Sequence, residues 1–210
     1  KGEYAEDGVG KLAMNFWPSL AEHVEGAAPE SLLEVGLTTG LIEKLGESYP
    51  QLNLYGLDRS ESSIEKSSTS ASAKGLRGVR WICGDFFDVD SWSGSVDAES
   101  PGTIYSLHFH ELMARGEASF VEALRSLKAA LPKWSLLAFE QPLLDPAERA
   151  ETPETLWLYS QSNVLIHHLI GNGRIQSRDA WLDLGTQAGC RRVTDRPCNY
   201  LGYRAFLFEL

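Results

Sequence analysis

The sequence has few cysteines, few basic residues and no long apolar run, and each scarcity excludes a class of protein. Its three cysteines, Cys83, Cys190 and Cys198, are odd in number and widely spaced. This pattern argues against a disulfide framework or a cysteine-based metal site and favours a reducing, cytoplasmic compartment. No apolar stretch approaches the length needed to cross a membrane, so no membrane partner is expected.

The shortage of basic residues argues against nucleic acid as a partner. Nineteen Lys and Arg residues stand against 29 Asp and Glu residues, which gives a formal net charge of −10. A surface of this sign repels a phosphate backbone. With 210 residues of which 43% are hydrophobic, the chain has enough apolar material for the core of one soluble, enzyme-sized domain. Its first residue is Lys1 and not methionine. The possibility that the sequence is a domain excised from a larger chain therefore stays open.

The most informative stretch combines a strand, a glycine turn and a helix. Residues 31–40 read SLLEVGLTTG, and residues 41–49 then show the apolar spacing of a helix. Glycine at such a turn lets a ligand approach the backbone, and the first N–H groups of the helix point toward that ligand. This arrangement is typical of a nucleotide site.

A second strand, residues 51–58, ends in Asp58. A carboxylate roughly twenty residues after the first glycine can accept hydrogen bonds from both hydroxyls of a ribose. The alternative is that Asp58 caps the helix that begins near Glu61, because Asp-Arg-Ser-Glu is also a good helix start. We favour the ribose role.

The rest of the chain alternates strands and helices. Further strands are expected at 79–83, 103–107 and 134–139, and helices at 60–74 and 120–131. The tail predicts helices at 154–169 and from Ser177 to Gly189, then two strands at 191–194 and 203–210. We therefore expect an α/β fold, a doubly wound, Rossmann-like, mostly parallel seven-stranded sheet that ends in an antiparallel hairpin.

Polar residues stand at the expected carboxyl ends of these strands. Ligands of doubly wound sheets bind at that edge, so these residues are expected to share one rim. They are Glu34, Thr38, Asp58, Asp85, His108 and Glu140.

The order of several segments resembles a known superfamily. The segments are LLEVGLTTG, LYGLD, GDFF, LHFHE, LKAAL followed by SLLAFE, and a helix ending in QAGC before the terminal hairpin. Together, over residues 31–210, they resemble class I S-adenosylmethionine-dependent methyltransferases, and within these the small-molecule O-methyltransferases of the plant caffeate and flavonoid type and their bacterial natural-product relatives. The resemblance implies S-adenosylmethionine as cofactor, S-adenosylhomocysteine as product, a catalytic domain at 29–210 and an N-terminal helical lid at 1–28.

The resemblance also assigns roles to single positions. It places Glu34, Gly36 and Gly40 at the methionine end of the cofactor, Asp58 at the ribose, and Asp85 and Phe86 at the adenine. The histidine after the fourth strand, His108, takes the role of the general base that accepts the proton of the acceptor hydroxyl. Glu140 is the carboxylate expected to orient His108.

The acceptor pocket is expected between the N-terminal lid and the helix at 157–169. The candidate substrate-binding residues are Met14, Trp17, Trp157, Asn163 and His167, although the aromatic residues near the N-terminus could instead pack on the sheet. The acceptor implied is a small molecule or an intermediate bound to a carrier protein. No metal is expected, since His167 and His168 lack a supporting carboxylate cluster.

Two departures from the family pattern keep other functions open. Thr38 replaces a glycine of the first turn, and Ile175 stands where a second acidic residue would orient the histidine. These departures leave open a noncatalytic cofactor-binding domain. A C-methyltransferase domain of the polyketide-synthase type, which uses a histidine with a glutamate on a carbon acid, also stays open.

Overall fold

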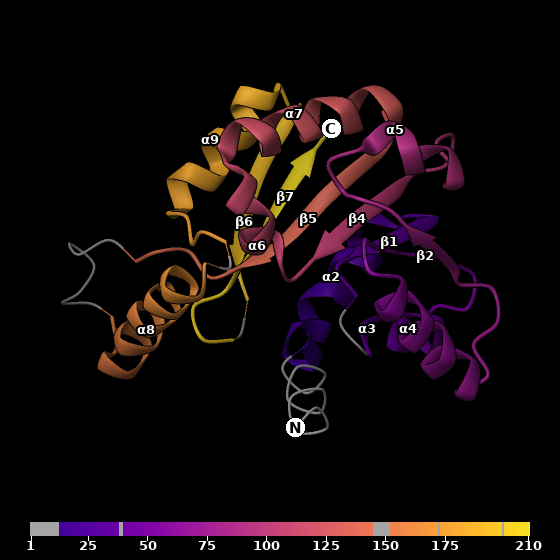
Figure 1. Ribbon diagram of the computed structural model, residues 1–210, viewed down its shortest axis with the longest axis horizontal. Helices are drawn as coiled ribbons and strands as arrows, with labels where there is room; N and C mark the ends of the chain where they lie inside the picture. Colours follow the sequence, from indigo (N-terminus) through magenta and orange to yellow (C-terminus); the bar gives the residue numbers. More distant parts are fainter. Residues whose placement is uncertain (1–12, 38–39, 145–151, 172, 199) are drawn as a thin grey trace.

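A computed structural model describes residues 13–37, 40–144, 152–171, 173–198 and 200–210. Its centre is a seven-stranded sheet in the order β3-β2-β1-β4-β5-β7-β6 (Figure 1). The strands are β1 Ser31–Val35, β2 Asn53–Asp58, β3 Arg80–Cys83, β4 Gly102–Ser106, β5 Trp134–Glu140, β6 Arg192–Pro197 and β7 Arg204–Glu209. Strands β1 to β5 are parallel, whereas β7 runs antiparallel to both β5 and β6. The predicted fold class, including the terminal antiparallel hairpin, is confirmed.

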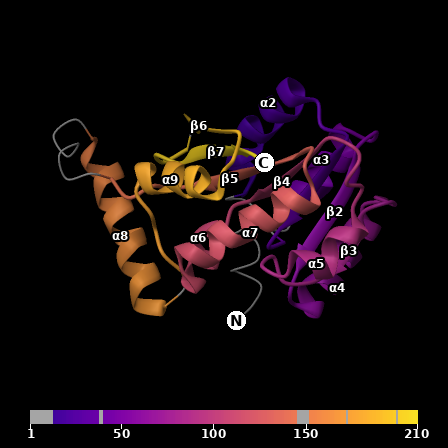
Figure 2. The same ribbon diagram turned by 90° about the horizontal axis from the view of Figure 1, so that it is seen from above.

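Helices cover both faces of the sheet (Figure 2). One face carries α2 (Trp17–Ala27) and α3 (Leu41–Ser48), with α4 (Glu61–Ala73) joined to α3 by a hydrogen bond from Ser70 to Glu43. The other face carries α5 (Val89–Trp92), α7 (Glu117–Ala130) and α9 (Arg178–Ala188). Shorter turns are η1 (Met14–Phe16), η2 (Ser93–Ser95), α6 (Phe109–Leu112) and η3 (Met113–Arg115).

The apolar core is divided into two clusters by the sheet. Successive side chains of a strand point to opposite faces, so Leu32 packs in the cluster under α2 and α3 while Leu33 packs in the cluster under α5, α7 and α9. All five residues of β1 are buried. This double burial explains why the central strands read as nearly continuous apolar runs in the sequence.

The expected element boundaries differ from the observed ones by only a few residues, but two short helices were not predicted. The N-terminal helical region is broken before Pro18, since η1 ends at Phe16 and Pro18 occupies the first turn of α2. The short helices α5 and α6 have four residues each. Four residues are too few to show a helical period in the sequence.

The helix α8 (Glu154–Ile170) lies beside the carboxyl ends of the strands and apart from both sheet faces (Figures 1 and 2). Its outer side exposes Leu158, Leu165, Ile166 and Leu169, each by more than half. None of the described helices is long and apolar enough to cross a membrane.

Candidate functional site

Five of the predicted site residues line one cavity at the carboxyl ends of the parallel strands. The cavity has a volume of about 560 Å³. These residues are Gly36, Asp58, Asp85, Phe86 and His108. The parallel register therefore gathers side chains that are far apart in the sequence, as expected.

Asp58 links the first glycine turn to the loop after β2. Its Oδ2 accepts a hydrogen bond from the backbone N–H of Leu37 (3.2 Å) and its Oδ1 accepts one from the backbone N–H of Ser60 (2.8 Å). The side chain of Ser60, not that of Asp58, caps α4. Each carboxylate oxygen of Asp58 keeps further acceptor capacity, which suits a pair of ribose hydroxyls.

Asp85 at the next strand end is already held by protein groups. Its Oδ1 accepts a hydrogen bond from the backbone N–H of Phe87 (3.0 Å), and its Oδ2 is paired with the guanidinium of Arg115. The Arg115 guanidinium also lies 4.7 Å from the centre of the Phe87 ring. Arg115, which lines the cavity, was not predicted, because no sequence motif marks a residue on the turn after α6.

Phe86, the predicted adenine-side residue, contributes to both the cavity wall and the core. Its side chain is only 3% exposed and contacts the rings of Phe109 and Phe120. Its role beside the adenine stays a prediction.

His108 stands beside the glycine turn. Its backbone N–H donates to Ser106 Oγ (3.0 Å), and a Cβ on Gly36 would be in ordinary van der Waals contact with its ring, 3.8 Å from Cδ2. Gly36 also has a φ of +71°, a conformation that glycine adopts without strain. Burial lowers the pKa of His108, and the nearby Glu111 carboxylate, 3.8 Å from Nδ1, only partly opposes this effect. The imidazole is therefore neutral at neutral pH.

Glu140 contacts His110, not His108. Its Oε2 lies 2.7 Å from Nδ1 of His110, and its Oε1 accepts the backbone N–H of His110 (3.0 Å). Burial by itself lowers the pKa of His110, but the charge and hydrogen bond of Glu140 outweigh it, so this pKa is raised. The prediction that Glu140 orients His108 is wrong, because residues two apart around a helical turn point in different directions.

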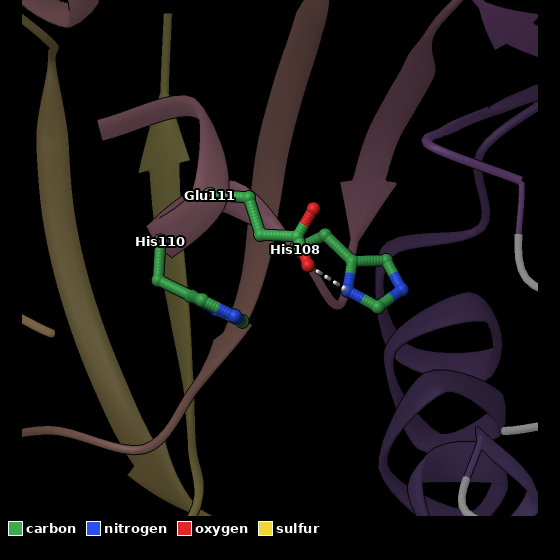
Figure 3. A group of neighbouring side chains, drawn as sticks. All are labelled: His108, His110 and Glu111. Carbon is green, nitrogen blue, oxygen red and sulfur yellow. Dashed lines mark ion pairs between the residues drawn. The ribbon is translucent and has the colours of Figure 1, made fainter. Parts of the chain in front are cut away.

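Figure 3 shows His108, His110 and Glu111 grouped on the α6 turn. One potential ligand atom of each lies within 4.8 Å of those of the other two. Two imidazoles and a carboxylate form a donor set that can hold a divalent transition metal. Since Nδ1 of His110 is bonded to Glu140, Nε2 is the nitrogen it would offer. This group was not predicted as a metal site.

Two residues predicted at the methionine end, Glu34 and Gly40, are not among the described wall residues of the 560 Å³ cavity. Glu34 is 1% exposed, accepts a hydrogen bond from the Tyr105 hydroxyl (3.1 Å) and is not part of the cavity wall. Glu34 and Leu32 are two residues apart along β1, so their side chains point to the same face of the sheet, the one that α2 covers. Gly40 precedes α3 with a φ of +118°. Thr38 lies outside the described residues.

The predicted acceptor residues near the N-terminus lie on the α3 side. A Cβ on Gly40 would be 3.4 Å from Cε of Met14, which places Met14 against the glycine turn. Trp17 instead packs near Tyr49, with Nζ of Lys44 5.6 Å from its ring centre, and does not line the cavity.

Among the predicted residues of α8, His167 comes nearest to the histidine pair. Its ring stands perpendicular to that of His110, with the ring centres 4.5 Å apart. Asn163 donates a hydrogen bond to Gln141 (3.0 Å), and neither Asn163 nor the half-buried Trp157 lines the 560 Å³ cavity.

A second, smaller cavity lies between α8 and the segment after it, with a volume of about 280 Å³. Its walls are Val164, His167, His168, Gly173, Arg174, Ile175 and Gln176. Ile175, singled out in the sequence as a departure from the family pattern, is thus a wall residue of this cavity.

Comparisons with known proteins identify the fold. No protein-family profile and no curated protein sequence matches this chain. Solved structures do match, among them PigF with SAH (TM-score 0.67, 17% identity, 95% of this chain and 57% of that one). An O-methyltransferase family protein from Burkholderia thailandensis matches with a TM-score of 0.72 and 15% identity, over 99% of this chain and 58% of that one.

A third match is the mitomycin 7-O-methyltransferase MmcR, with a TM-score of 0.67 and 17% identity over 87% of this chain and 50% of that one. The chain thus spans between 50% and 58% of the length of these three proteins. These matches, with TM-scores of 0.67 to 0.72, show that this chain has the fold of the class I S-adenosylmethionine-dependent O-methyltransferases.

Proposed function

We propose that this chain is an S-adenosylmethionine-dependent O-methyltransferase that acts on a hydroxyl of a small molecule or of a carrier-bound natural-product intermediate. One observation carries the proposal: a single cavity brings together Asp58, Asp85 and His108 at the strand ends of this fold. The presence of SAH in the matching PigF structure supports the same cofactor pair here.

The cavity residues fit this cofactor. When bound, S-adenosylmethionine supplies a methyl group on a positively charged sulfur. Asp58 would accept hydrogen bonds from the ribose hydroxyls, and Asp85 and Phe86 would hold the adenine. Gly36 would let the methionine end approach the backbone, because it has no side chain and adopts a φ of +71°.

We propose His108 as the general base. Its lowered pKa keeps the imidazole neutral, so a ring nitrogen can accept the hydroxyl proton as the acceptor oxygen takes the methyl group. The Glu111 carboxylate, 3.8 Å from Nδ1, would stabilise the imidazolium that forms. Positioning of the acceptor supplies much of the remaining rate enhancement.

The His110–Glu140 pair is a second candidate for the base. A buried histidine whose pKa is raised by a carboxylate is a stronger proton acceptor than one whose pKa is lowered. His110 does not line the 560 Å³ cavity, whereas His108 does. We therefore assign first place to His108.

Calorimetric titration tests the proposed function. The wild-type chain is titrated with S-adenosylmethionine and S-adenosylhomocysteine, and so are Asp58→Ala and the control Asp183→Ala, which removes an exposed carboxylate of α9. We expect binding that is lost in Asp58→Ala and kept in Asp183→Ala. Since Asp58 also accepts two backbone N–H groups, a thermal melt must show that Asp58→Ala is folded. Absence of binding by the wild type would contradict the proposal and favour a noncatalytic domain.

The proposal extends to partners and location. The odd number and wide spacing of the cysteines support a cytoplasmic enzyme. A net charge of −10 supports a small-molecule or carrier-bound acceptor over a nucleic acid. Methyl transfer to a carbon acid with no hydroxyl would instead identify the C-methyltransferase alternative.

A further inference from the structure

The 280 Å³ cavity lies beside His110 of the α6 turn. Its wall residue His167 contacts the ring of His110, with ring centres 4.5 Å apart. Gly171 lines the 560 Å³ cavity and Gly173 lines the smaller one, so the same short segment borders both. A molecule that enters the smaller cavity therefore comes close to His110.

The walls of this cavity are unusual for so acidic a protein. The chain has a formal net charge of −10, yet the described wall residues include Arg174, His167, His168 and Gln176 and no carboxylate. All four of these side chains can donate hydrogen bonds. Such a wall favours an anionic or strongly hydrogen-bond-accepting ligand.

The segment that carries Arg174 is fixed to α6. The backbone N–H of Arg174 donates to the carbonyl oxygen of His110 (2.8 Å). Gly173 has a φ of +88° and packs so tightly on His110 and Glu111 that a Cβ would overlap their backbone. Arg174 is thus anchored next to the histidine pair, while its guanidinium and the His168 ring form no ion pair with the described residues.

We propose that the 280 Å³ cavity is a subsite for an anionic oxygen group of the methyl acceptor, bound by Arg174 with help from His167 and His168. The planar guanidinium can donate two parallel hydrogen bonds to the oxygens of a carboxylate or a phosphate. A group held there would leave the acceptor hydroxyl directed toward His108 and His110. This inference rests on the proposed methyltransferase function and adds the chemical class of its acceptor.

Two sources could supply the anionic group, and they differ in size. A free acceptor would carry its own carboxylate, and a cavity of this volume suits a single-ring compound. A carrier-bound acceptor would bring the phosphate of its phosphopantetheine arm. Both place anionic oxygens beside Arg174, so binding experiments must separate them.

The test measures binding of acceptor probes in the absence of cofactor. The probes are the three hydroxybenzoate isomers, the matching hydroxybenzamides and phosphopantetheine, and dissociation constants are obtained by NMR titration. The variants are Arg174→Gln and His168→Gln, with Arg191→Gln as the control because Arg191 is an exposed arginine outside both cavities.

We expect an anionic probe to bind more tightly than its neutral match. Loss of a charge-assisted hydrogen bond in Arg174→Gln should weaken binding of the anionic probe by about tenfold or more. We expect a smaller loss of affinity in His168→Gln and none in Arg191→Gln. Binding of the neutral amides should be the same in all variants. Preference for a hydroxybenzoate would identify a free acid as the acceptor, and preference for phosphopantetheine would identify a carrier arm.

The inference is overturned if no anionic probe binds better than its neutral match, or if Arg174→Gln binds it as well as the wild type does. Titration of the same variants with S-adenosylmethionine separates this failure from failure of the proposed function. If the chain binds the cofactor but does not distinguish acid from amide, only the subsite proposal is contradicted. If the wild type does not bind the cofactor, the methyltransferase proposal is contradicted.

Discussion

Glu140 and His110 are joined twice, through the side chain and through the backbone. Oε2 of Glu140 lies 2.7 Å from Nδ1 of His110, and Oε1 accepts the backbone N–H of the same residue. Both carboxylate oxygens thus fix one histidine, which presents its Nε2 away from Glu140. His108, only two residues earlier, has Glu111 3.8 Å from its Nδ1 instead and lines the cavity of the proposed cofactor. The two histidines therefore have different environments and different expected roles.

Replacement of each histidine by alanine should separate these roles. With a hydroxyl acceptor, we expect His108→Ala to lower turnover by a factor of about one hundred or more, because the hydroxyl proton loses its acceptor. His110→Ala should have a smaller effect. Steady-state kinetics measure turnover, and calorimetry checks that affinity for S-adenosylmethionine is unchanged. The opposite ranking would transfer the base role to His110.

Glu140→Gln should lower the pKa of His110. The substitution removes the charge that raises this pKa and leaves the burial that lowers it. NMR titration of isotope-labelled histidines measures the shift, and Glu61→Gln, an exposed change on α4, is the control. Because the folded-state pKa is raised, the pair stabilises the wild type most below the ordinary pKa of histidine, and this stabilisation is lost as pH rises through the raised value. If the stability of Glu140→Gln falls with rising pH as much as that of the wild type, the Glu140 charge does not raise the pKa of His110.

His23 should make the protein less stable in mild acid. Burial and the nearby Arg196 lower its pKa from 6.5 to about 4, and its Nε2 lies 3.0 Å from Oγ1 of Thr103. The neutral form is thus favoured in the fold, and its contribution is complete above pH 6.5 and is lost as pH falls toward 4. The loss amounts to roughly 3 kcal/mol in the free energy of unfolding. Urea unfolding at several pH values should show it in the wild type and not in His23→Gln.

Chelation should leave the proposed reaction unchanged. If His108 accepts the proton directly, its nitrogen must be free of metal, so we expect EDTA-treated protein to keep its turnover within about twofold. Loss of activity on chelation, with recovery on addition of Zn²⁺ or Mn²⁺, would show instead that His108, His110 and Glu111 act as metal ligands. Metal analysis of the purified protein completes the measurement.

The fold and much of the proposed cofactor site could be predicted because they depend on periodicity and on strand ends. Apolar runs marked buried strands such as β1 and β5, and a parallel sheet places the residues that follow its strands on one edge. Gly36, Asp58 and Asp85 accordingly line the same cavity. Local rules sufficed here, since each of these residues needed only its own strand to be recognised.

The partners of the charged side chains were decided by the tertiary structure alone. Glu34 bonds to Tyr105 and Glu140 to His110, pairs separated by 71 and 30 residues. The α6 turn, too short to leave a periodic signal, determines that His108 faces the cavity and that His110 faces Glu140. The placement of Arg115 over Phe87 and of Arg174 beside His110 likewise depends on loops from different parts of the chain. The sequence by itself determined which strand ends carry chemistry, whereas packing decided which side chains meet there, because side-chain direction in short turns depends on contacts that sequence spacing does not encode.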